Sequence, residues 1–352
     1  MIRRLLLSAS LLALAGCSAV GHWSQAAGGH LGITRAARPV SDWLADPATP
    51  ADLAARLRLS QQMRDFASRE LALPDNNSYR RYADLKRSAA VYNVIAAPEF
   101  GFTLKTWCYP LMGCAGYQGW FELDAAKQRA DALKAEGWEV QVQPIPAYST
   151  LGWSRLLGGD PLLNTFIRYT EGELAAMIFH ELAHQRVYVS DDTGFNEAYA
   201  SAVELIGARR WLAGKPEALT AFEAGRERRA RFLALARDGR ERLQAVYSGP
   251  AASRPAGKAA VMAALRQRAP TEAPGYEAWF QRANNANFAI LSAYSDLVPA
   301  FMRLFEQEGR DWVKFHAAVE RLAPLPRDER RATLRGLEGG SDDTDPATRQ
   351  TR

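Results

Sequence analysis

The sequence has few cysteines, little net charge and no internal repeat. Three cysteines in 352 residues are too few to supply the second thiolate pair that a tetrahedral cysteine-type zinc site requires. The formal net charge is +5, and arginines are interleaved with acidic residues as on a solvated helical surface, so the composition requires no nucleic-acid partner. Hydrophobic residues make up 47% of the chain, which is enough to bury a large core in one or two domains.

The N-terminal residues have the pattern of a bacterial lipoprotein signal. Two arginines are followed by an apolar segment, Leu5 to Ala13, which is much shorter than the ~20 residues that span a bilayer. Leu14 to Cys17 then fits the lipobox, in which the cysteine is diacylated and becomes the mature N-terminus. We expect residues 1–16 to be the signal peptide, Cys17 to carry a lipid anchor in the membrane, and Ser18 to favour the outer membrane, with the protein facing the periplasm. The alternative is an ordinary signal peptide with an incidental cysteine.

Cys108 and Cys114 are the cysteines that remain after this processing. In an oxidising periplasm, two cysteines so close in sequence are expected to form a disulfide. Pro110 and Gly113 let the chain double back between them, and closing so small a loop would stabilise the fold by ~2 kcal/mol. A metal site is the weaker interpretation, because the C-x5-C spacing has no second pair and no nearby histidine to complete a tetrahedron.

The hydrophobic periodicity predicts an α+β fold that is predominantly helical, with a small sheet ahead of a helical C-terminal half. Strands are expected at 91–95, 103–107, 119–123 and 138–143. Helices are expected at 51–70, 79–88, 124–136, 170–188, 196–212, 216–247, 259–268, 276–306 and 311–322.

These patterns divide the chain into five regions. The expected regions are a signal peptide (1–16), a tether rich in Gly, Ala and Ser (17–35), a zincin-like catalytic core that joins the small sheet to the HExxH helix (36–215), a C-terminal helical region that completes the cleft (216–323), and a polar tail that is partly disordered (324–352).

The motif His180-Glu181-Leu-Ala-His184 carries the functional interpretation. Residues i and i+4 are offset by about 40° on a helix, so both imidazoles lie on one face and can close on one metal ion. Thr170 and Glu173 form a capping box at the start of this helix. Only five histidines occur in the chain, so chance is a poor explanation for the motif, and core histidines held by ordinary hydrogen bonds are the minor alternative. The motif therefore predicts a zinc ion, Zn²⁺, bound to this helix.

Glu197 is the expected third metal ligand. Asn196 is a favourable N-cap, which would place Glu197 in the first turn of the next helix, and an antiparallel return would bring that turn to the metal. Two histidines and one glutamate leave the open coordination position of a catalytic zinc site. A third histidine in an HExxHxxGxxH motif is excluded by the sequence. Asp191 or Asp192 remains an alternative third ligand.

Glu181 is the expected general base, because it neighbours a ligand without binding the metal. Zinc would polarise a scissile carbonyl and lower the pKa of a water molecule, and Glu181 would pass the proton of that water to the leaving amine. The oxyanion needs a further donor, for which Tyr294, Tyr188 and Tyr148 are candidates. Each of these tyrosines could instead be a packed residue with a satisfied hydroxyl.

The segments His180-Glu-Leu-Ala-His-Gln185 and Asn196-Glu-Ala-Tyr-Ala-Ser201, with Val203-Glu204 after them, resemble the HExxH … NEGFA signature of the aminopeptidase N type of gluzincin. This resemblance implies His180, His184 and Glu197 as zinc ligands and Glu181 as the base. The stretch between the second histidine and the glutamate is several residues shorter than in that type. The chain also has no Gly-x-Met-Glu-Asn motif, with which that type anchors the free amine of its substrate.

From about Ala37 to Leu322 the chain resembles a bacterial family described as putative aminopeptidases, many of them lipoproteins. The segments that carry this resemblance are Trp43-Leu-Ala-Asp, Leu73-Pro-Asp-Asn, Ala97-Pro-Glu-Phe, Thr106-Trp-Cys-Tyr-Pro, Ala147-Tyr-Ser-Thr-Leu-Gly-Trp153 and Asn284-Asn-Ala-Asn. It implies an aminopeptidase with a peptide substrate. A zinc endopeptidase, an envelope hydrolase of non-peptide amides and a non-catalytic envelope lipoprotein that acts as a scaffold are the alternatives.

Overall fold

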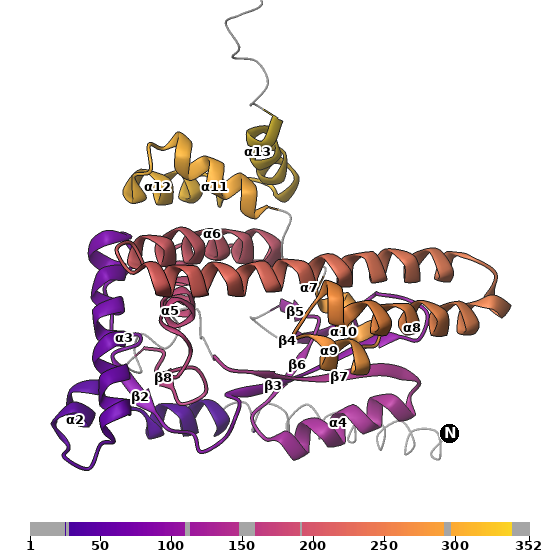
Figure 1. Ribbon diagram of the computed structural model, residues 1–352, viewed down its shortest axis with the longest axis horizontal. Coiled ribbons are helices and arrows are strands. Elements are labelled where there is room, and N and C mark those ends of the chain that lie inside the picture. The colour runs from indigo at the N-terminus through magenta and orange to yellow at the C-terminus, as the bar shows by residue number, and fades with distance from the viewer. Residues whose placement is uncertain are drawn as a thin grey trace, which may run out of the picture.

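The computed structural model describes residue 25 and residues 28–109, 113–147, 159–190, 192–291 and 297–339. Over these residues the fold is α+β and predominantly helical, as predicted, with two three-stranded sheets and one two-stranded sheet (Figure 1). None of the described helices is both long enough and apolar enough to cross a membrane.

The N-terminal part combines helices with a small sheet. Its elements are β1 (Arg38–Pro39), α2 (Val40–Ala45), α3 (Ala51–Glu70), β2 (Arg81–Ala83) and β8 (Leu162–Leu163), and β2 pairs with both other strands. The helix expected at 79–88 is wrong, because Tyr79 and Lys86 have positive φ values of 65° and 55° that an α-helix does not contain. At the end of the expected tether, residues 28–36 are helical and Ile33 is buried.

The second sheet is antiparallel, with strand order β6 (Gln118–Trp120), β3 (Val91–Pro98) and β7 (Trp138–Ile145). Successive side chains of a strand point to opposite faces. One face of β3, with Tyr92 and Val94, packs on α4 (Leu123–Ala135), and the other, with Ile95, packs on α10 (Asn285–Leu291). Burial on both faces explains why β3 is almost continuously apolar.

A two-stranded hairpin follows β3, formed by β4 (Trp107–Tyr109) and β5 (Gly113–Ala115). Cys108 and Cys114 lie directly opposite each other in this hairpin and form a disulfide, with their Cα atoms 3.9 Å apart.

The central helices are α5 (Glu171–Arg186) and α6 (Thr193–Trp211), which pack against each other in the largest hydrophobic core. Gly207 of α6 allows a close approach, because a Cβ there would lie 2.8 Å from Leu71 and 3.0 Å from Phe179 of α5. The apolar residues of α5 are buried as its periodicity predicts, so its polar side chains are concentrated on the remaining face.

The C-terminal half is helical. Its helices are α7 (Pro216–Ser248), α8 (Arg254–Glu272), α9 (Glu277–Arg282), α10 (Asn285–Leu291), α11 (Val298–Gln307), α12 (Trp312–Leu322) and α13 (Arg327–Gly339). Helix α7 runs from the α5–α6 pair to α8 and α10 along the length of the molecule, and α11, α12 and α13 lie beyond α6 (Figure 1).

One expectation for this half needs correction, and the structure adds a helix that was not predicted. The single helix expected at 276–306 is interrupted after α9, because Ala283 is extended and the backbone N–H of Asn284 bonds the side chain of Asn287 instead of continuing a helix. The polar tail expected from residue 324 forms helix α13 over 327–339, where Leu334 and Arg330 are buried. Tertiary partners stabilise this helix despite its polar composition.

Candidate metal centre

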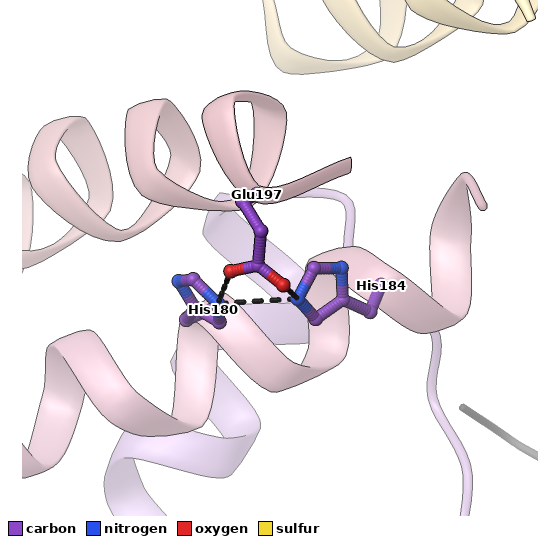
Figure 2. Close-up of side chains that lie close together, drawn as sticks. All are labelled: His180, His184 and Glu197. Carbon is purple, nitrogen blue, oxygen red and sulfur yellow. Dashed lines mark hydrogen bonds and ion pairs between the residues drawn. The ribbon is translucent and has the colours of Figure 1, made fainter. Parts of the chain in front are cut away.

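Helices α5 and α6 bring three potential metal ligands together, which we call the metal group: His180, His184 and Glu197 (Figure 2). The Nε2 atom of His180 lies 3.1 Å from that of His184 and 3.4 Å from one carboxylate oxygen of Glu197. The other carboxylate oxygen of Glu197 lies 3.6 Å from Nε2 of His184. Zinc–ligand distances near 2.1 Å imply donor atoms about 3.4 Å apart in a tetrahedral site. The spacing of the three donors therefore fits one ion.

The position of both histidines follows from the local structure of α5. The predicted capping box is present: the Thr170 hydroxyl accepts a hydrogen bond from the Glu173 backbone, and the Glu173 carboxylate accepts one from the Thr170 N–H. This cap fixes the start of the helix, and the spacing of four residues then aligns the imidazoles on one face.

The start of α6 differs from the prediction. Asp192, rather than Asn196, is the N-cap, and its carboxylate accepts a hydrogen bond from the Phe195 N–H. Asn196 lies inside the helix, where its carboxamide accepts from the Val189 N–H at 2.8 Å and donates to the Val189 carbonyl at 2.7 Å. Glu197 is thus in the second turn, next to a side chain that binds α6 to Val189 in the α5–α6 connection.

Asp192 does not join the metal group. Its side chain is 1% exposed and accepts hydrogen bonds from Arg330 and Arg331 of α13. Its carboxylate is therefore occupied elsewhere. The other alternative ligand, Asp191, lies outside the described residues.

Glu204 is the residue of the site whose role the sequence reasoning missed. Its carboxylate lies 2.8 Å from Nδ1 of His180 and 3.5 Å from the guanidinium of Arg226 on α7. A carboxylate on one ring nitrogen holds the imidazole in the tautomer whose other nitrogen has a free lone pair. The signal was present, because Glu204 follows Glu197 by seven residues, or nearly two turns, and so shares its face of α6.

The charges around the group favour a cation. Burial and the neighbouring His180 lower the pKa of His184 to about 4, so that His184 is neutral near pH 7. Burial disfavours the charged form of His180, but hydrogen bonds to Glu197 and Glu204 outweigh it and raise the pKa of His180 well above its usual value. Burial opposes ionisation of Glu197 as well, yet its contact with His180 lowers its pKa. A site that stabilises positive charge between two carboxylates has suitable chemistry for a divalent ion.

Glu181 lies on α5 next to His180 and is half-buried. Burial and then the charge of Glu181 raise the pKa of Tyr79. Against the effect of burial, the same charge adds to the effect of Glu197 and Glu204, which raise the pKa of His180. Glu181 is therefore within electrostatic reach of both side chains.

A polar network holds the last turn of α5. The carboxamide of Gln185 accepts a hydrogen bond from Asn76 at 2.8 Å and donates to Asp160 at 3.2 Å and Ser78 at 3.1 Å. The fully buried Arg64 organises the loop that carries these partners, by donating to the carbonyl groups of residues 74, 76 and 78. Because the network binds the residue after His184, it restrains that ligand.

Of the three tyrosines proposed as oxyanion donors, one lies within the described residues. Tyr188 is exposed, directly after the C-cap of α5, while Tyr148 and Tyr294 lie outside the described residues, as does Cys17. The structure adds Tyr117, which is 39% exposed and whose pKa is raised by partial desolvation and then by the charge of Glu197. Tyr117 thus lies within electrostatic reach of the metal group, which no sequence pattern indicated.

A family model described as "Putative aminopeptidase" matches residues 21–334, which include every element from α2 to α12 and most of α13. The chain belongs to this family. Searches of the curated proteins and of the solved structures found no match. The family match supports a peptidase, and the residues that could hold a metal ion lie within its range.

Proposed function

We propose that this protein is a zinc-dependent peptidase, and specifically an aminopeptidase. The observation that carries the proposal is the convergence of His180, His184 and Glu197 beside Glu181, in a chain of the aminopeptidase family. Two imidazoles and one carboxylate suit zinc and leave a coordination position for a reactant.

Each residue of the site has a distinct task in this proposal. Zinc held there would polarise the scissile carbonyl and make a water molecule acidic enough to be deprotonated near neutral pH. Glu181 accepts the proton of the attacking water and delivers it to the nitrogen of the departing amine. Glu204 keeps the lone pair of His180 directed at the metal position. A tyrosine hydroxyl, from Tyr294 or Tyr188, donates a hydrogen bond to the oxyanion.

The substitution Glu181→Gln tests this function. It preserves the size of the side chain and leaves the three ligands unchanged, so zinc content and melting temperature should stay near those of the wild type. Loss of a general base lowers kcat by about 10²–10⁴-fold. The measurement is hydrolysis of aminoacyl amides and of blocked internal peptides by both proteins at equal zinc load.

The substrates cut by the wild type distinguish the alternatives. Cleavage of aminoacyl amides alone supports the aminopeptidase, whereas cleavage of blocked peptides alone would replace it with an endopeptidase. Equal cleavage by wild type and Glu181→Gln would contradict the assigned base. Zinc binding without any hydrolysis would favour a non-catalytic lipoprotein.

We further propose that Cys17 anchors the protein to the outer membrane, facing the periplasm. The lipobox at Leu14 to Cys17 supports this location, and the Cys108–Cys114 disulfide is a bond that persists in oxidising compartments. The wild type should sediment with membranes, and Cys17→Ser should block processing or release the protein. A wild type found wholly in the soluble periplasm would contradict the anchor.

A further inference from the structure

A buried ion-pair cluster joins the start of α6 to the C-terminal helix α13. Asp192 accepts hydrogen bonds from Nη1 of Arg330 at 2.6 Å and Nη2 of Arg331 at 2.9 Å. The side chains of Asp192 and Arg330 are 1% and 5% exposed. We name these three residues the α6–α13 clasp.

The members of the clasp have further partners within the fold. Besides the two arginines, the Asp192 carboxylate accepts the Phe195 N–H, so both of its oxygens are used. Arg330 also donates to the Leu325 carbonyl, and its guanidinium lies 5.0 Å from the centre of the Phe195 ring. Buried charges are costly unless they are paired and hydrogen-bonded. Removal of one member would therefore disturb its partners.

The clasp lies close to the third metal ligand. Asp192 precedes Glu197 by five residues, which is about 7.5 Å along a helix axis. Between them, Phe195 is fully buried and Asn196 is bonded to Val189. The first turns of α6 are thus held from two sides, by Val189 of the α5–α6 connection and by α13.

We infer that the α6–α13 clasp positions Glu197 against His180 and His184, so that the C-terminal helix sets the affinity of the metal site. This inference rests on the proposed zinc binding. Asp192, Arg330 and Arg331 are positioning residues in it, because they act through α6 and do not contact the metal ligands. A clasp that served stability alone would change the melting temperature and leave zinc affinity unaltered.

The test compares zinc dissociation constants, measured by competition with a chromophoric chelator well below the melting temperature. Arg330→Ala should raise the zinc dissociation constant about 10–100-fold, as loss of the partners that orient ligands does. Arg330→Lys, which can still reach the carboxylate, should recover part of the loss. Arg209→Ala is the matched control, because it removes an exposed ion pair with Glu223 at the other end of α6 and should change the constant less than twofold.

The outcomes separate the clasp from the proposed function. If the wild type binds zinc and the Arg330 variants bind it equally well, the clasp has no positioning role, even if their melting temperatures fall. If the wild type binds no zinc, the proposed function and the clasp are both overturned. Should Arg330→Ala fail to fold, Arg331→Ala decides in the same way, because its side chain is 28% exposed and its loss is better tolerated.

Discussion

Two pairs of helices in this protein, α5–α6 and α7–α8, differ in the polarity of the side chains that they bury. In α5–α6, polar side chains are buried at the helix pair: His184 belongs to the metal group and Asn196 bonds Val189. In α7–α8, the buried stripe is apolar, with Leu235, Leu243 and Leu265 among its members, and the charged residues pair outside it.

The difference shows that this fold buries polar side chains in α5–α6 although their burial costs free energy. An apolar stripe stabilises a helix pair by removing hydrocarbon from water, and exposed ion pairs beside it contribute little. Buried imidazoles and carboxylates stabilise much less, because they lose hydration and need matched partners. In α5–α6 the buried imidazole of His184 and the part-buried carboxylate of Glu197 are explained by the metal group, whereas α7 and α8 serve to pack and to supply Arg226 to Glu204.

The largest effect is expected when a ligand is removed from α6. Glu197→Ala should abolish zinc binding and peptidase activity, because two histidines alone leave the ion without its only carboxylate ligand. Zinc per chain and hydrolysis are the measurements. Glu241→Ala, which removes an exposed carboxylate from α7, should leave both unchanged. Full zinc content in Glu197→Ala would move the third ligand elsewhere.

A core truncation in the second pair should lower stability without changing the chemistry. Leu265 of α8 is 1% exposed and packs closely over Gly239 of α7. Leu265→Ala should lower the free energy of unfolding by about 2–5 kcal/mol, as measured by denaturant titration, with kcat/KM unchanged in the folded protein. Leu265→Met is the control, at less than about 1.5 kcal/mol. A large loss of kcat/KM would show that α7–α8 takes part in catalysis.

A smaller effect is expected when only the orientation of a ligand is disturbed. Glu204→Gln keeps a hydrogen-bond acceptor near Nδ1 of His180 but removes the negative charge, so zinc affinity should fall about 10–100-fold. Glu223→Gln is the matched control, because its partner is the exposed Arg209. An unchanged affinity in Glu204→Gln would mean that packing alone orients His180.

The smallest effect is expected for the surface ion pairs of α7–α8. Asp238 contacts Arg242 at 2.9 Å and Arg268 at 2.5 Å, and about a third of its side chain is exposed. Asp238→Asn should lower the free energy of unfolding by less than about 1 kcal/mol and leave zinc affinity unchanged. A loss as large as that of Leu265→Ala would remove the contrast between the two helix pairs.

Helices with strong periodicity or a local cap were predictable. The boundaries of α3 and α7 and the capping box of α5 follow from side chains that are near neighbours in sequence. Strand β2 and helix α13 were missed, because the partners that stabilise them are distant in sequence. The strand β8 pairs with β2, and Asp192 binds α13.

The amino-acid sequence by itself determined that His180, Glu181 and His184 share one helix, since their relation depends only on helical periodicity and a local cap. It also indicated Glu197, but for an incomplete reason, because the N-cap it suggested lies within α6. Only the tertiary structure decided that Glu204 holds His180 and that Asp192 binds α13 instead of the metal group. These contacts depend on how helices pack, and packing is set by complementarity between surfaces that are remote in sequence.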